Sequence, residues 1–304
     1  MNVKHLAAAA LAALAIACGG CSGAKSSANT ADAAIAEGWE YFEASEYSLA
    51  LAGFLRAEEL AGDDATLQEA KFAQGLIWHV RTRPDNNPAK AREAYRKAIE
   101  IDPRSELAAW ADLWCARIAS EVDRGEYPPA ADRLAAYQGV VERYPDHPAG
   151  EEAFLCVEAI KLEEDTPEIA RTVRAELEDF LATHPDSDWR QTAYGLLVHC
   201  DDLLDDLDAL YDHSRKGWEA RYVNPADPEA DPTLIHWKLA LIAEFDVGDL
   251  EAAVAHYRAF IDRYPNHQRT FLALQELERL EAVLGIETEE QTPVSSEEDG
   301  HGQE

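Results

Sequence analysis

Residues 249–265, which read DLEAAVAHYRAFIDRYP, carry a clear helical pattern. Apolar residues recur there in steps of three and one, which draws a single stripe along an α-helix, whereas a strand would show alternation. Pro265 ends the stripe, because a proline ring cannot continue a helix and favours an extended turn. The stripe consists of Leu250, Ala253, Val254, Tyr257, Phe260 and Ile261.

A second apolar stripe precedes this segment. Leu234, Trp237, Leu241 and Phe245 share one face of a helix that ends before Val247-Gly248-Asp249. A short turn that contains glycine, between two amphipathic helices, is typical of a helical hairpin. We expect residues 231–265 to form one such hairpin.

Proline spacing extends this pattern over most of the chain. Pro103, Pro145, Pro185, Pro225 and Pro265 are separated by 42, 40, 40 and 40 residues. A fixed period of this size indicates a repeat array, whose units are too small to bury their own apolar faces and must stack. The predicted hairpins are 31–62, 65–103, 104–145, 147–185, 187–225 and 231–265. A segment with apolar Phe271, Leu274, Leu277, Leu280 and Leu284, from His267 to Leu284, would cap the stack.

The spacing inside two units resembles the tetratricopeptide repeat. The first carries Gly38, Tyr41, Tyr47, Ala50, Phe54 and Ala57, and the second carries Gly75, Trp78, Ala91, Tyr95, Ala98 and Pro103. The resemblance implies an all-α fold, an α–α superhelix of about six helical hairpins with a C-terminal capping helix. It covers residues 31–285, which we expect to form one continuous solenoid. The period near 40 residues exceeds the usual repeat of about 34 and implies longer helices.

The N-terminus resembles an export signal. Lys4 precedes twelve uncharged residues, 6–17, a run too short to remain as a bilayer span. The run ends Leu-Ala-Ile-Ala before Cys18, which resembles the lipobox of bacterial lipoproteins. The resemblance implies a signal peptide at 1–18, lipidation of Cys18 and a flexible tether at 19–30. Because Gly19 follows in place of the Asp that retains such proteins at the inner membrane, it also implies an outer-membrane lipoprotein that faces the periplasm. The alternatives are Cys21 as the anchor and an ordinary signal peptide cleaved nearby.

Three cysteines remain after this segment. Cys115, Cys156 and Cys200 lie in successive units among apolar neighbours. An odd number argues against a disulfide framework, so we expect small buried side chains. The mature sequence has no CxxC spacing, and we predict no metal site.

The chain is strongly acidic. It has 59 Asp and Glu against 27 Lys and Arg, a net charge of −32. Such a field repels nucleic acid and favours basic partners, although solubility alone also explains it. Residues 286–304 contain no Lys or Arg and are predicted to be a disordered acidic tail.

The sequence does not indicate an enzyme or a cofactor. It contains no nucleophile elbow, HExxH or phosphate-binding loop. The acidic pairs 201–202 and 205–206 suggest calcium or acid–base chemistry, but their spacing favours a solvated helix end. We interpret His147, His184 and His267 as structural residues at turns.

The best candidates for binding are aromatic. Trp39, Phe42 and, one unit later, His79 fall where tetratricopeptide proteins line their concave groove, although helical aromatic stripes also occur in cores. The architecture resembles the lipoprotein of the outer-membrane barrel-assembly machinery and the accessory protein of the Tol-Pal system. It implies a non-catalytic scaffold for a protein or peptide partner. The alternatives are a solute-binding lipoprotein that serves a transporter and a helical enzyme acting on cell-wall polysaccharide.

Lipidation at Cys18 gives a direct test. Because the lipid is attached through the thiol, Cys18→Ser should abolish labelling by a fatty-acid probe and release the protein from membranes. Cys21→Ser is the matched control and should keep both. Label retained on the Cys18→Ser protein would contradict the assignment.

Overall fold

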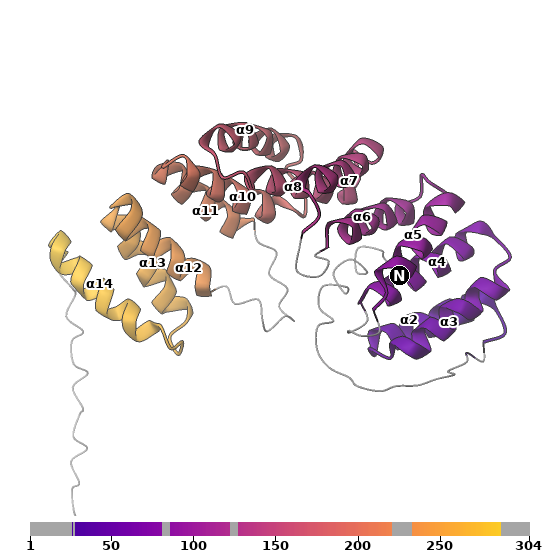
Figure 1. The fold of residues 1–304 in the computed structure, drawn as a ribbon. Coiled ribbons are helices and arrows are strands. Elements are labelled where there is room, and N and C mark those ends of the chain that lie inside the picture. Colours follow the sequence, from indigo (N-terminus) through magenta and orange to yellow (C-terminus); the bar gives the residue numbers. More distant parts are fainter. Residues whose placement is uncertain (1–25, 27, 81–85, 122–126, 221–232, 287–304) are drawn as a thin grey trace, which may run out of the picture. The chain divides into compact units, whose positions relative to one another are not determined.

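A computed structural model describes residues 26, 28–80, 86–121, 127–220 and 233–286. Within these ranges the chain forms thirteen α-helices, one π-helical segment and no strand, so the all-α prediction is confirmed (Figure 1). None of the described helices is both long and apolar enough to span a bilayer. Cys18, Cys21, Pro225 and the tail from 287 lie outside the described residues.

The helices follow the predicted hairpins in order. Each of the six expected ranges corresponds to one helical pair, with α4 beginning one residue before its range, and the expected cap contains a single helix. The bounds are α2 Ala31–Glu43, α3 Tyr47–Leu60, α4 Asp64–Val80, α5 Pro88–Ile101, α6 Glu106–Ser120, α7 Ala130–Arg143, α8 Pro148–Leu162, α9 Pro167–Thr183, α10 Arg190–Leu203, α11 Leu207–Glu219, α12 Thr233–Leu241, η1 Ile242–Val247, α13 Leu250–Arg263 and α14 Thr270–Leu284.

Local chemistry sets these bounds. The side chains of Thr30, Ser105 and Asp249 accept hydrogen bonds from backbone N–H groups of the helices that they precede. At the other end, α5, α7, α9 and α13 each stop two residues before a proline of the 40-residue series. The proposed role of the prolines as helix stops is therefore confirmed at those four positions.

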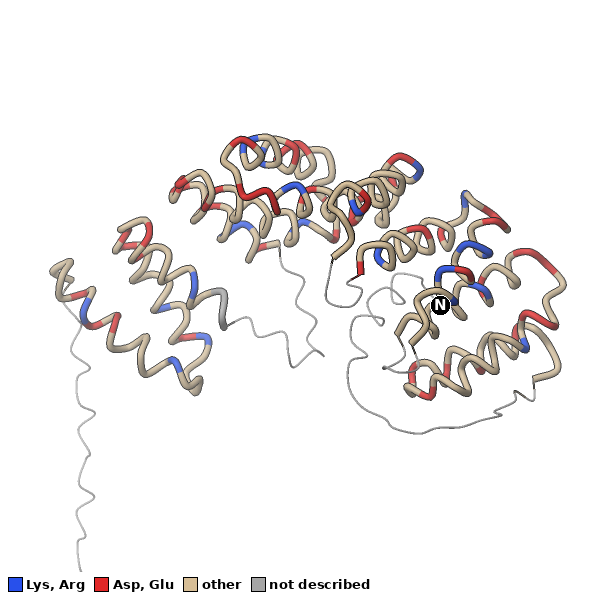
Figure 2. The backbone as a smooth tube through the Cα atoms, in the orientation of Figure 1, with Lys and Arg blue, Asp and Glu red and all other residues tan. Residues whose placement is uncertain are grey.

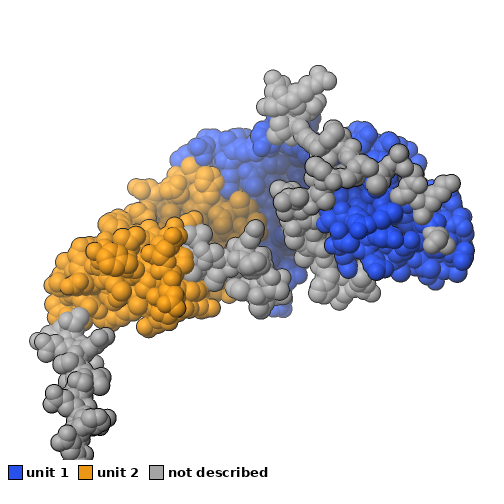
Figure 3. Space-filling view, turned by 90° about the horizontal axis from the view of Figure 1, so that it is seen from below, with its two compact units in different colours: residues 1–169, 184–189 blue, residues 170–183, 190–304 orange. Residues whose placement is uncertain are grey.

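The chain divides into two compact units (Figure 3), residues 1–169 with 184–189 and residues 170–183 with 190–304. In the first unit, consecutive helices from α2 to α8 pack on one another. Alternate helices also touch, α2 with α4, α4 with α6 and α6 with α8. The first helices of successive hairpins therefore stack side by side, which is the arrangement of a tetratricopeptide-like solenoid.

A glycine facing an aromatic ring sets the closest approach within the first two hairpins. A Cβ atom at Gly38 would lie 2.5 Å from the Phe54 ring, and one at Gly75 would collide with the Tyr95 ring. Phe54 and Tyr95 are fully buried. Each ring thus fills the space that the missing side chain leaves, and the two helices pack without a void.

The last three helices form their own core around Tyr257 and Phe260. Here one sequence expectation is wrong, because Phe245 is 67% exposed and does not continue the apolar stripe. The π-helical segment η1 places an extra residue in the turn and changes the direction in which the next side chains point. Glu244 takes the inner position, where it accepts a hydrogen bond from the Tyr257 hydroxyl (3.0 Å) and pairs with Arg279.

The capping helix is also less complete than its sequence suggests. Leu280 is buried and Leu277 and Leu284 pack against the core, whereas Phe271 and Leu274 are 66% and 48% exposed. The three inner leucines are spaced three and four residues apart and share a face with Ala273. Phe271 and Leu274 lie off that face, so only part of the apolar pattern is used for packing.

The glycine contacts predict opposite effects for the same substitution. Gly75→Ala should destabilise the first unit by about 1–3 kcal/mol, because the new methyl group overpacks the site against Tyr95. Gly195→Ala, at an exposed position of α10 with nothing within 4 Å of the new atom, should stabilise by about 0.5–1 kcal/mol. Chemical denaturation followed by circular dichroism measures both. Equal effects at the two sites would contradict this packing.

Candidate functional site

The candidate site is a pocket between α2 and α4, the first helices of the first two hairpins. Its volume is about 400 Å³, within the range of sites that enclose a ligand or a side chain. Six lining residues come from α2 and two from the start of α4. They are Asp32, Ile35, Ala36, Trp39, Glu40, Glu43, Thr66 and Glu69.

Helical spacing explains why α2 presents these residues together. Positions 32, 36, 39 and 43 recur every three or four residues and therefore lie on one face of the helix. The helix carries four acidic residues and no Lys or Arg. Figure 2 shows this absence of basic residues along α2. From Ala31 to Glu69 the sequence holds ten Asp and Glu and a single basic residue, Arg56.

Trp39 forms the apolar floor of the pocket. Its side chain is 4% exposed and packs edge-on against the rings of Phe42 and Phe54, with centroids 5.6 and 4.9 Å away. The indole N–H donates a hydrogen bond to Glu69 Oε1 at 2.8 Å, which holds a carboxylate of α4 over the pocket. The indole therefore joins the hydrophobic core to the acidic rim.

The acidic rim is electrostatically uncompensated. Asp32, Glu40 and Glu43 are exposed, and no ion pair to them, or to Glu69, is formed among the described residues. Glu58, in the same hairpin, shows the contrast. Burial would raise the pKa of Glu58, but hydrogen bonds from Lys71 and Gln74 outweigh it and lower that pKa. In the rim, Glu69 accepts only from the neutral indole of Trp39 among the described contacts, so the rim keeps its negative charge.

The structure separates the three residues that the sequence offers for binding. Trp39 lines the pocket, and Phe42, which is 5% exposed, packs between Trp39 and Tyr47. His79 lies elsewhere, against Trp114 of α6 with ring centroids 4.9 Å apart, and its Nε2 is 2.6 Å from Glu121. Their role in binding stays a prediction, and only Trp39 is placed at a pocket.

The sequence reasoning missed the carboxylates of the rim. It treated the negative charge as a property of the whole chain, whereas Asp32, Glu40 and Glu43 form a local group with Trp39. The signal was present in the helical spacing of α2. The contribution of Glu69 was not visible, because it depends on how α4 packs beside α2.

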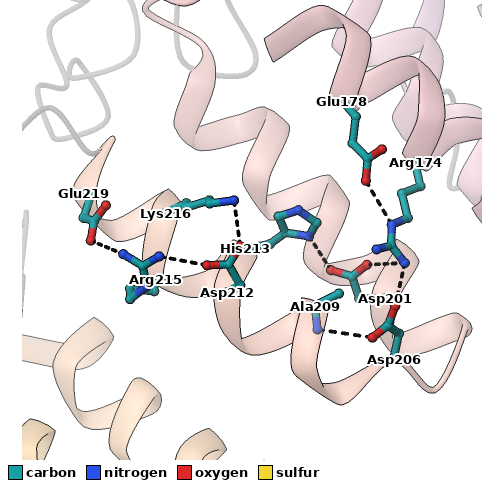
Figure 4. Close-up of polar contacts among 10 residues, drawn as sticks. All are labelled: Arg174, Glu178, Asp201, Asp206, Ala209, Asp212, His213, Arg215, Lys216 and Glu219. Carbon is teal, nitrogen blue, oxygen red and sulfur yellow. Dashed lines mark hydrogen bonds and ion pairs between the residues drawn. The ribbon is translucent and has the colours of Figure 1, made fainter. Parts of the chain in front are cut away.

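A second charged cluster lies in the other unit (Figure 4). Asp201 is fully buried, with Oδ2 2.6 Å from His213 Nδ1 and Oδ1 3.3 Å from Arg174 Nη1. Arg174 also pairs with Asp206 at 2.8 Å. The expected solvated helix end is therefore wrong for Asp201. Each of these carboxylates lies beside a basic side chain. The cluster is therefore a polar network that joins α9, α10 and α11.

The expectation of buried cysteine side chains is confirmed for Cys200, whereas Cys115 and Cys156 are half-buried. Cys115, Cys156 and Cys200 are free thiols, and burial raises the pKa of Cys115 to about 11, which keeps it protonated. His147 and His267 accept backbone hydrogen bonds through Nδ1 at helix starts, which confirms their role at turns. Across the described ranges, no group of three or more His, Cys, Asp or Glu is arranged to hold a metal ion.

Comparison with known proteins supports the repeat assignment. Residues 236–267 and 85–105 each match a family described as tetratricopeptide repeat. These two segments are similar to tetratricopeptide repeats. The matches fall in the last and second predicted hairpins. A search of curated proteins gives no significant match.

Two solved structures share the fold. PilW, a widely conserved type IV pilus biogenesis factor, aligns with a TM-score of 0.51 and 19% identity over 82% of this chain and 100% of its own. PilF of Pseudomonas aeruginosa aligns with a TM-score of 0.50 and 15% identity over 83% of this chain and 97% of its own. At such identities the similarity concerns the fold alone.

Burial of the pocket floor predicts a stability effect. Trp39→Ala should cost about 3–5 kcal/mol, the range for a large aromatic side chain removed from a core. Leu55→Ala, in the same hairpin at a side chain 46% exposed, should cost less than about 1 kcal/mol. Denaturation of the two variants measures the difference. An unchanged stability for Trp39→Ala would show that the indole is not part of the core.

Proposed function

We propose that the chain is a non-catalytic scaffold that binds a basic segment of a partner protein along the stacked first helices of its hairpins. The observation that carries this proposal is the pocket between α2 and α4, which combines an apolar floor with four uncompensated carboxylates. A Lys or Arg side chain fits this chemistry, because its methylene groups pack on apolar surface while its charged end reaches carboxylates.

The proposed location is the periplasmic side of the outer membrane, with Cys18 as a lipid anchor. This part rests on the sequence of the first 19 residues. The fold is compatible with it, since PilW, which shares the fold, is described as a pilus biogenesis factor. From this likeness we take only a general role, that of a scaffold in envelope assembly or maintenance. Nucleic acid is not a proposed partner, because this chain and nucleic acid both carry negative charge.

A small solute is the alternative occupant. The pocket volume lies within the range of small-molecule sites. A solute carrier should retain its ligand on purification, and native mass spectrometry of the full chain would reveal the added mass. A peptide-binding scaffold should show the mass of the chain alone.

Site-specific crosslinking can identify the partner. A photoreactive amino acid at Ala36, an exposed residue of the pocket, should capture a protein segment in intact cells. The same group at exposed Ala131 of α7, which is not among the pocket residues, is the control and should not. The captured segment, identified by mass spectrometry, should contain Lys or Arg near the crosslinked residue. Capture of acidic or wholly apolar segments would contradict the proposal.

Charge reversal tests the electrostatic part. Glu40→Lys with Glu43→Lys should weaken binding of a peptide with the captured sequence at least about tenfold near 50 mM salt, and the difference should shrink near 0.5 M salt. Glu100→Lys with Glu142→Lys makes the same change in net charge at exposed positions away from the pocket. That control should bind like the parent protein. Equal losses in the two double variants would attribute the effect to overall charge.

A further inference from the structure

Two histidines lie where α11 meets the last three helices of the second unit. The Trp218 ring of α11 faces His236 of α12 with centroids 4.1 Å apart. The Tyr211 hydroxyl of α11 lies 2.8 Å from His256 Nε2 of α13. Helices α12, α13 and α14 have a core of their own, against which Tyr211 packs from α11. The two pairs of rings are thus prominent contacts of this junction.

His236 is buried without polar partners. Its side chain is 6% exposed, and neither ring nitrogen has a hydrogen-bond partner in the described part of the chain. It faces two aromatic rings. One is Trp218 of α11, and the other is Tyr264, which follows α13 and has its ring centroid 6.4 Å from that of His236. Burial lowers its pKa from the usual 6.5, and the positive charges of Arg263 and His256 lower it further. The ring is therefore neutral at pH 7.

His256 has a similar environment with one polar contact. The Tyr211 hydroxyl donates to Nε2 when the proton of the neutral ring is on Nδ1. Burial lowers the pKa of His256, as does Arg215 of α11, while Asp249 at the start of α13 acts in the opposite direction. A second proton on the ring would remove the acceptor at Nε2 and place a cation near Arg215.

We propose that the junction between α11 and helices α12–α14 is an acid-sensitive contact that opens when His236 and His256 take up protons. Protonation would bury one cation between aromatic rings near Arg263 and a second near Arg215. Opening hydrates both imidazolium rings, so the open form binds protons more tightly. The closed contact is fully stable above about pH 6.5, weakens as the pH falls below that value, and reaches its minimum below the depressed pKa values.

Two other histidines do not share this environment. His213 lies 2.6 Å from the carboxylate of Asp201, and His79 lies 2.6 Å from that of Glu121. Each of these rings is paired with a carboxylate, whereas His236 has no polar partner among the described residues and His256 contacts a hydroxyl. The junction thus differs from both of these contacts in the groups that face its imidazole rings.

Hydrogen exchange of the full chain tests this proposal. Between pH 6.5 and 5.5, after correction for the intrinsic rate, exchange of amides in α11 and α12 should increase relative to α2 and α3. The largest possible increase in the exchange rate is about tenfold per pH unit for each histidine that gains a proton, or about a hundredfold for both. The double variant His236→Phe with His256→Gln should lose this dependence, because phenylalanine keeps an aromatic ring and glutamine can still accept from Tyr211. His79→Gln, in the other unit, should keep it.

Either of two results would overturn the proposal of an acid-sensitive junction. Exchange in α11 and α12 that follows α2 and α3 at every pH would show that the junction does not open in acid. An unchanged pH dependence in the double variant would assign the opening to other groups. Should that variant fail to fold, ring resonances of the two histidines in the parent protein decide the question. Titration of both at or above pH 6.5 would reject the proposal, and titration of both below it together with acid-dependent exchange would support it.

Discussion

Close packing of two helices around a glycine and an aromatic ring is the contact on which the first unit depends. Gly38 accommodates Phe54, and Gly75 accommodates Tyr95, at distances that leave no room for a Cβ atom. Because each hairpin is held this tightly, its second helix takes a fixed place and the next hairpin packs on it. The first helices then lie beside one another, and a pocket between α2 and α4 results.

The same excess of negative charge has different consequences at different depths. At the pocket, the carboxylates of α2 remain in contact with water and need no partner, so their field is available to a ligand. In the second unit, Asp201 is fully buried and is paired with both His213 and Arg174. An unpaired charge at that depth would cost several kcal/mol. Burial therefore determines which acids hold helices together and which can attract a partner.

Histidine illustrates the same dependence on environment. At helix starts, His147 and His267 use a ring nitrogen to accept a backbone N–H, a local role that follows from their position before the helix. At the α11 junction, His236 has no partner and His256 has only a hydroxyl. The first pair stabilises turns at neutral pH, and the second pair makes an interhelical contact sensitive to acid.

The sequence by itself determined the all-helical class and the helix ends before four of the spaced prolines, because apolar spacing and proline act within one hairpin. Only the tertiary structure decided how deeply each side chain is buried. Phe245 is exposed because a π-helical segment rotates it outward, and Asp201 is buried because Arg174, 27 positions earlier in the sequence, packs beside it. Helical periodicity names the inward face of one helix, whereas burial and charge pairing depend on neighbours that are distant in sequence.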